Sequence, residues 1–233
     1  VHVIDPSSGK RLTTVGGISF PWQVSPTGKH LSYFRREAYH IVDLSSGIES
    51  TISSAAITDF NNREFDHPVE EKPPFGFGGW SKNGQSIIVY DKYDIWQLDL
   101  AGSAKKLTNG STDQIIHRYI NLGDEDWIDL EKDLYFSLRG EWTLNHGFAR
   151  FQNGNIETLR YEDNNLSRLS KATETDVYAY IAQDFDDPPD YFVSNPSLRE
   201  TKQVTNINKF QDDYDWGRSE LIQYKNHRGR KKA

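Results

Sequence analysis

Glu70 and Glu71 are the adjacent side chains of this sequence whose types most directly point to chemistry. Two carboxylates that lie close together attract an ammonium group and hold it by charge-assisted hydrogen bonds, so the pair is a candidate site for an amine. The pair stands directly before a Lys-Pro-Pro segment, residues 72–74. The same residues are also compatible with a solvated acidic loop, and both interpretations stay open at this point.

Other candidate chemistries are weaker. The nearest match to the nucleophile elbow G-x-S-x-G is GISFP, Gly17–Pro21, which lacks the second glycine, so we expect no catalytic residue there. The acidic clusters Gln183–Asp190 and Gln211–Asp215 lack the spacing of a calcium loop and are typical of turns. The seven His never pair at metal-ligand spacing, and Gly76–Trp80 lacks the lysine of a phosphate loop. We therefore expect no metal and no cofactor.

Composition excludes several classes of function. The net charge of -7 argues against nucleic acid or an anionic membrane surface as the main partner. No apolar run reaches the roughly 18 residues of a transmembrane helix, so we expect no membrane insertion. Cys is absent, which excludes a disulfide, a thiolate zinc site and a Cys nucleophile. Met is absent too, and we interpret the chain as a piece of something longer or as a processed product.

An internal repeat indicates the elements that must position any site. The turn SPTG at residues 25–28 matches SKNG at 81–84, and VDLSSG at 42–47 matches LDLAGS at 98–103. Both matches are offset by 56 residues, since Gly28 aligns with Gly84 and Asp43 with Asp99. A fixed offset shared by two motifs marks one repeating structural unit.

Each unit contains four short strands separated by turn residues, which is the make-up of a propeller blade. Weaker matches predict a third unit over residues 133–159, a fourth over 166–206, and the second half of a blade at Val1–Val15. We therefore predict an all-β fold, a β-propeller of about four four-stranded blades plus a half blade, forming an arc of a larger ring. The missing half blade is expected upstream of this chain.

Two insertions interrupt the repeat, and three tryptophans accompany it. Thr58–Phe75 is polar and bounded by proline, which predicts a loop or a short helix at a blade entry, and Gly123–Lys132 is acidic and turn-like. We place Trp22, Trp80 and Trp96 at repeat positions, where packing between blades is their expected role. Stacking on a carbohydrate is the alternative role of such aromatics.

Three segments carry a family resemblance: Lys72–Gly84, Tyr90–Leu100 and Trp216–Lys231. With them, the chain resembles the propeller of the prolyl oligopeptidase family of serine peptidases, in particular its dipeptidyl peptidase IV-like and acylaminoacyl-peptidase-like bacterial members. In that family a segment like WGRSELIQYKNHRGRK is where the chain leaves the propeller for an α/β-hydrolase domain. The resemblance implies blades over residues 1–215 and an exit strand over 216–233.

The resemblance also implies separate roles for the propeller and the hydrolase domain. The catalytic Ser, Asp and His would come after the exit strand, so this chain alone is not expected to hydrolyse peptides, while its parent protein would be a serine peptidase. The propeller would gate and position peptide substrates, and its partners would be those peptides and the hydrolase domain of the same polypeptide. In dipeptidyl peptidase relatives a glutamate pair about ten residues before the W-S-x-N-G turn holds the substrate's free α-amino group. Glu70 and Glu71 stand ten and nine residues before Trp80.

Two other classes of function stay open. The W-S-P-x-G and D-L-x-x-G motifs also resemble non-catalytic TolB-like propellers, which are protein-binding platforms in the cell envelope. The coding sequence beyond residue 233 would discriminate between a hydrolase domain and such a platform. A polysaccharide-binding or hydrolysing propeller would need paired carboxylates facing one cleft. The peptidase resemblance implies a periplasmic or secreted protein, with the cytoplasm as the second choice.

Overall fold

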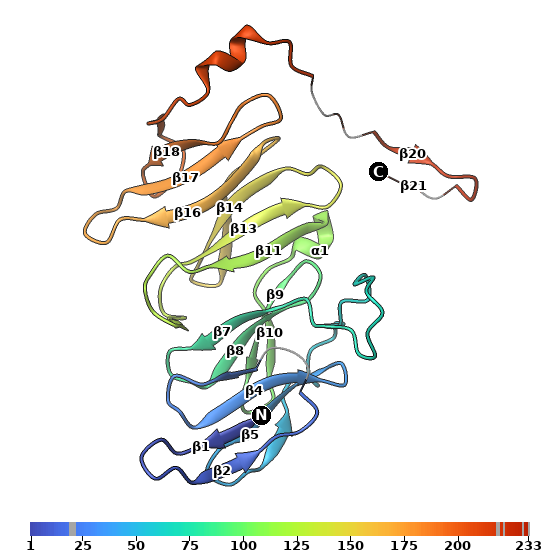
Figure 1. Cartoon of the computed structure of the whole chain (residues 1–233), viewed down its shortest axis with the longest axis vertical. Coiled ribbons are helices and arrows are strands. Elements are labelled where there is room, and N and C mark those ends of the chain that lie inside the picture. Colours follow the sequence, from blue (N-terminus) through green and yellow to red (C-terminus); the bar gives the residue numbers. More distant parts are fainter. Residues whose placement is uncertain (19–21, 218–219, 221, 230, 233) are drawn as a thin grey trace.

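The computed structural model describes residues 1–18, 22–217, 220, 222–229 and 231–232. Small antiparallel sheets succeed one another in chain order along a curved stack (Figure 1). The first sheet is a hairpin of β1 (His2–Ile4) and β2 (Arg11–Thr14), which is the expected half blade.

Four sheets with four sequential antiparallel strands come after the half blade. The first two are β3 (Trp22–Val24), β4 (His30–Arg35), β5 (Ala38–Asp43) and β6 (Glu49–Thr51), then β7 (Phe77–Ser81), β8 (Ser86–Tyr90), β9 (Ile95–Asp99) and β10 (Ala104–Lys106). The next two are β11 (Ile115–Ile120), β13 (Leu134–Gly140), β14 (His146–Gln152) and β15 (Asn155–Glu162), then β16 (Asn165–Lys171), β17 (Tyr178–Gln183), β18 (Asp190–Ser194) and β19 (Thr201–Gln203). These are β-propeller blades, and the predicted fold class is confirmed.

The repeated S-x-x-G turns have a common physical cause. Gly28 and Gly84 lie in the left-handed region, at φ of 67° and 66°, where glycine carries no steric penalty. The hydroxyls of Ser25 and Ser81 each accept a hydrogen bond from the backbone N–H five residues later, at 3.1 and 3.0 Å. Serine and glycine therefore close each hairpin together, which explains why both residues recur at the same offset.

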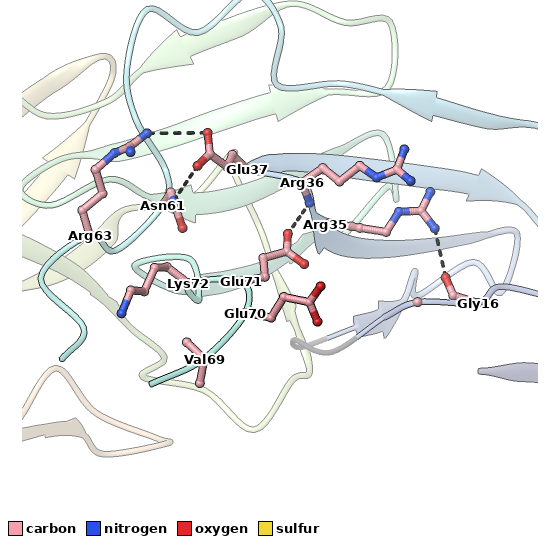
Figure 2. A pocket seen from close by; sticks show the side chains of 11 residues that line it. Gly16, Arg35, Arg36, Glu37, Asn61, Arg63, Val69, Glu70, Glu71 and Lys72 are labelled. Atoms are coloured by element: carbon pink, nitrogen blue, oxygen red, sulfur yellow. Dashed lines mark hydrogen bonds and ion pairs between the residues drawn. The ribbon is translucent and has the colours of Figure 1, made fainter. Parts of the chain in front are cut away.

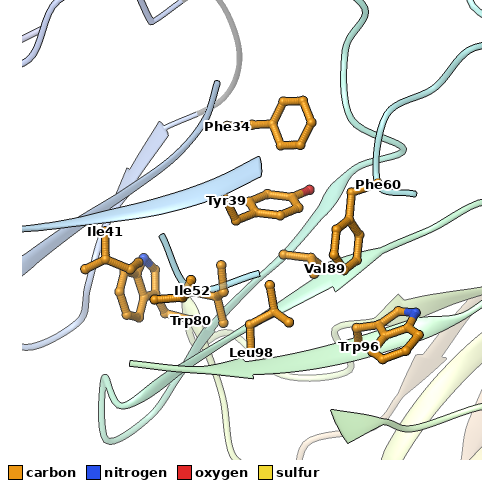
Figure 3. Packing of buried hydrophobic residues seen from close by; sticks show 10 residues of the cluster. Phe34, Tyr39, Ile41, Ile52, Phe60, Trp80, Val89, Trp96 and Leu98 are labelled. Carbon is orange, nitrogen blue, oxygen red and sulfur yellow. The ribbon is translucent and has the colours of Figure 1, made fainter. Parts of the chain in front are cut away.

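Hydrophobic clusters between successive sheets form the core. Between the first two blades, Phe34, Tyr39 and Ile41 pack against Trp80 and other side chains of β7, β8 and β9 (Figure 3). Corresponding clusters lie between the second and third blades, between the third and fourth, and between the half blade and the first. Because full burial of one large apolar side chain contributes about 1.5–3 kcal/mol, these interfaces hold the arc together.

The tryptophans correct one sequence-based expectation. Trp80 and Trp96 are packed, with exposed fractions of 1% and 9%, but Trp22 is 51% exposed. The repeat offset of 56 aligns Trp22 with Gly78, so Trp22 is not at the position of Trp80. Our placement of Trp22 at a packed repeat position was wrong, because its distance from the turn differs by two residues.

The insertions are more structured than their composition indicates. The segment 58–75 is a loop without a helix, and an isolated bridge between Asn61 and Pro74 closes its base. The acidic segment 123–132 contains β12 (Trp127–Ile128), which pairs in parallel with β7 and adds a fifth strand to the second blade. Neither β12 nor the assignment of β11 to the third blade was predicted.

The remaining elements are short. They are α1 (Gly110–Asp113), the 3-10 helix η1 (Lys209–Asp213), and a hairpin of β20 (Tyr224–Lys225) and β21 (Lys231–Lys232). Five residues of the expected exit strand, 218, 219, 221, 230 and 233, lie outside the described residues, and the domain limits 1–215 and 216–233 stay predictions. Within the described part of the chain, no helix is long and apolar enough to cross a membrane.

Candidate functional site

Glu70 and Glu71 line a pocket of about 1160 Å³ (Figure 2). Three parts of the fold meet there: Gly16 and Gly17 between β2 and β3, the tight turn between β4 and β5, and the loop 58–75 between β6 and β7. The loop projects from the arc on the same side as α1 (Figure 1). The pocket thus brings together charged side chains that are about 35 residues apart in the sequence, such as Arg36 and Glu71.

The turn between β4 and β5 adopts an unusual backbone conformation. Its two central residues, Arg36 and Glu37, lie at φ of 51° and 63°, the left-handed region that a type I′ hairpin requires. Glycine or asparagine normally occupies such positions, and another residue costs roughly 1–3 kcal/mol of strain. Strain of this kind persists where contacts from neighbouring segments hold it, and the loop 58–75 supplies such contacts.

Glu71 makes one of these contacts. Its Oε1 accepts a hydrogen bond from the backbone N–H of Arg36 (Figure 2). Glu70 is exposed, and within the described residues its carboxylate has no hydrogen-bond or ion-pair partner. Glu70 and Glu71 therefore line one pocket, but their contacts differ. Glu71 holds the turn, and Glu70 is available to a ligand.

Lys72 leaves this negative charge unneutralised. Its Nζ donates to the backbone carbonyls of Phe65 at 2.7 Å and His67 at 3.1 Å, so it closes the loop on itself. The guanidinium of Arg36 has no ion-pair partner among the described residues. The pocket therefore offers a free anionic group at Glu70 and a free cationic group at Arg36.

Glu37 ties the turn to the loop from the other side. Its Oε1 accepts from Asn61 Nδ2 at 3.0 Å, and its Oε2 lies 3.5 Å from Arg63 Nη2 (Figure 2). Arg63 Nε also donates to Asp59 at 2.5 Å, and this contact raises the pKa of the Arg63 guanidinium. These contacts fix the wall of the pocket and engage both carboxylate oxygens of Glu37.

Sequence reasoning missed Arg36, Glu37 and Asn61. The available signal was the charged stretch RREA between two predicted strands, which marks a turn. This charged stretch does not show that the turn contacts the loop 58–75, which connects the first blade to the second.

The other candidates from the sequence either hold the fold together or lie outside the described residues. Ser19 of the GISFP segment lies outside the described residues. In the cluster 183–190, Asp190 is 2% exposed and accepts hydrogen bonds from Gln203, Thr205 and the backbone of Ile207, so it secures the chain after β19. Among the residues that the structure describes, no group of three or more His, Asp and Glu side chains could hold a metal ion.

The glycines of Gly76–Trp80 serve close packing. A Cβ on Gly78 would lie 2.8 Å from the Tyr90 hydroxyl, and one on Gly76 would lie 2.9 Å from the Tyr90 ring. The glycines thus admit a large side chain of the adjacent strand β8.

Comparisons with known proteins agree with the fold. No family model matches this sequence, and no curated protein matches it either. Among solved structures, dipeptidyl peptidase 4 of Porphyromonas gingivalis matches with a TM-score of 0.53 at 12% identity, over 88% of this chain and 37% of that one. Oligogalacturonate lyase of Vibrio parahaemolyticus matches with a TM-score of 0.52 at 8% identity, over 88% and 58%. TolB of Acinetobacter baumannii matches less well, with a TM-score of 0.43 at 18% identity, over 88% of this chain and 48% of that one.

These similarities identify a class of fold. At identities of 12% and 8%, the matches to the dipeptidyl peptidase and the oligogalacturonate lyase show a shared β-propeller architecture and nothing finer. The chain spans 58% of the length of that lyase and 37% of the length of that peptidase.

Proposed function

We propose that this chain is the propeller of a serine peptidase of the prolyl oligopeptidase family, and that its Glu70 pocket binds the free amino terminus of peptide substrates. The observation that supports the proposal best is the unpartnered carboxylate of Glu70, beside Glu71, in a pocket of about 1160 Å³. Lys72, the nearest cation in sequence, donates elsewhere and does not compete for it.

The physical basis is charge-assisted hydrogen bonding. A substrate ammonium would donate to Glu70 and to the second oxygen of Glu71, whose first oxygen already accepts from Arg36. A hydrogen bond to a charged group contributes about 1.5–3 kcal/mol, which corresponds to roughly 10- to 100-fold in affinity. Acetylation of the amine removes both its charge and two of its donors.

The remaining parts of the proposal rest on the family resemblance and on the similarity of fold to a dipeptidyl peptidase. The propeller would cover the active site and admit peptides by size. The hydrolase domain of the same polypeptide would supply the serine, the histidine base and the oxyanion hole for acyl transfer to water. The proposed location is periplasmic or secreted.

A binding experiment tests the proposal. The affinity of the chain for Gly-Ala-Ala amide and for its N-acetyl form is measured by isothermal titration calorimetry, on the wild type and on Glu70→Gln. The wild type should prefer the free amine by about 10-fold or more, and Glu70→Gln should lose most of that preference. Glu174→Gln is the matched control, since Glu174 is exposed and lies outside the pocket. Equal affinity of the wild type for both peptides would refute the proposal.

A further inference from the structure

A buried amide in the wall of the same pocket has an unused acceptor. Asn61 is 4% exposed, and its Nδ2 donates to Glu37 at 3.0 Å. The carboxylate of Glu37 fixes the orientation of the amide, because the opposite orientation would place two oxygens against each other. Oδ1 therefore points away from Glu37 (Figure 2), and it has no hydrogen-bond partner among the described residues.

The position of Asn61 is held by its backbone as well. Its N–H donates to Asp59 Oδ1 at 2.9 Å, and the residue forms the bridge to Pro74 at the base of the loop. The backbone of Asn61 is therefore fixed, and rotation of the side chain toward water would break its hydrogen bond to Glu37. Buried acceptors in proteins are nearly always paired, so an orphaned one in a pocket wall calls for a donor.

Asn61 also stands between two pockets. Together with Arg63 it lines the Glu70 pocket and a smaller one of about 300 Å³, whose wall includes Phe75 and Tyr93. A ligand that extends from Glu70 toward the smaller pocket passes Asn61. The Oδ1 atom exposes less than 1 Å², so a donor reaches it once a side chain of the pocket wall moves aside.

We propose that Asn61 Oδ1 accepts a hydrogen bond from a backbone N–H of a peptide whose terminal ammonium lies at Glu70. The inference rests on the proposed function and narrows it: the pocket takes a peptide, held at its terminus and at an N–H near that terminus, and not a simple amine. Because proline lacks a backbone N–H, a peptide with proline at the position read by Asn61 would be disfavoured.

The test compares ligands that differ by one N–H. Gly-Ala-Ala amide is compared with its analogues N-methylated at the second or at the third residue, by isothermal titration calorimetry. We expect one methylation to weaken binding to the wild type by about 3- to 10-fold, the range of a single neutral hydrogen bond. In Asn61→Ala the same methylation should change affinity less than about twofold, since the acceptor is gone.

Controls separate this result from a structural effect. Asn62→Ala removes the same side chain one residue later, where it contacts the Glu64 backbone, and should keep the wild-type discrimination. A ratio of two affinities on one variant is independent of the fraction of folded protein. If Asn61→Ala binds neither peptide, the ratio is measured on Asn61→Leu, whose side chain has a similar shape and no acceptor.

Two results overturn the inference. One is a wild type indifferent to both methylations, and the other is discrimination in the Asn61 variants equal to that of the wild type. Either result leaves the preference for a free over an acetylated amine intact, so the two failures are distinguishable. Absence of any binding to the wild type would refute the proposed function and this inference with it.

Discussion

Replacement of Trp80 by phenylalanine should destabilise the chain far more than the same replacement of Trp22. The Trp80 indole is 1% exposed within the cluster between the first two blades, and its Nε1 donates to the Gln23 carbonyl at 3.2 Å (Figure 3). Phenylalanine loses that hydrogen bond, about 1 kcal/mol, and leaves a cavity that costs about 1–2 kcal/mol more. Trp22 is 51% exposed, so its replacement should cost under about 1 kcal/mol.

Thermal unfolding followed by circular dichroism measures the difference. For a chain of this size, 1 kcal/mol corresponds to about 2–4 °C, so Trp80→Phe should lower Tm by about 4–12 °C and Trp22→Phe by less than about 4 °C. Both variants carry the same type of substitution and are followed by the same probe. The difference between their Tm values depends on the register of the repeat, which aligns Trp22 with Gly78 and not with Trp80. Equal shifts in the two variants would refute the alignment of Trp22 with Gly78 and the packing derived from it.

Two further predictions concern the blades. Burial raises the pKa of Asp94, but hydrogen bonds from Thr108, Ser111 and the Gly110 backbone outweigh burial, and the net effect is a lowered pKa. The ionised carboxylate should therefore stabilise the fold above about pH 4, and this stabilisation should be lost on acidification. Thermal unfolding between pH 7 and pH 3 should therefore show a deficit of Asp94→Asn that narrows in acid, and a deficit independent of pH would contradict this. Gly147→Ala should cost more than about 3 kcal/mol, since the new Cβ would lie 2.0 Å from the Arg160 carbonyl oxygen, whereas Gly217→Ala, with nothing within 4 Å, should be nearly neutral in urea unfolding.

The repeat made most of the fold predictable. The two S-x-x-G turns and the strands after them recur at one offset, and the structure has hairpins at both places. Such local signals act within about ten residues, and a single sequence carries them directly. β12 carries no such signal, because its two residues become a strand only by pairing with β7, which is distant in the chain.

The candidate site was predictable only in part. The adjacent carboxylates of Glu70 and Glu71 are visible in the sequence, but their different contacts depend on the turn at Arg36. That turn has positive φ at two non-glycine residues, which local preferences argue against. The orphaned oxygen of Asn61 depends on burial and on the position of Glu37, neither of which leaves a mark in the sequence.

Sequencing the coding DNA past the codon for Ala233 tests the peptidase proposal most directly. We predict that the reading frame continues into an α/β-hydrolase domain with a G-x-S-x-G nucleophile elbow, followed in order by an aspartate and a histidine. A stop codon, or a continuation that adds only further blades, would contradict the proposal. A binding platform of the TolB kind would then take its place.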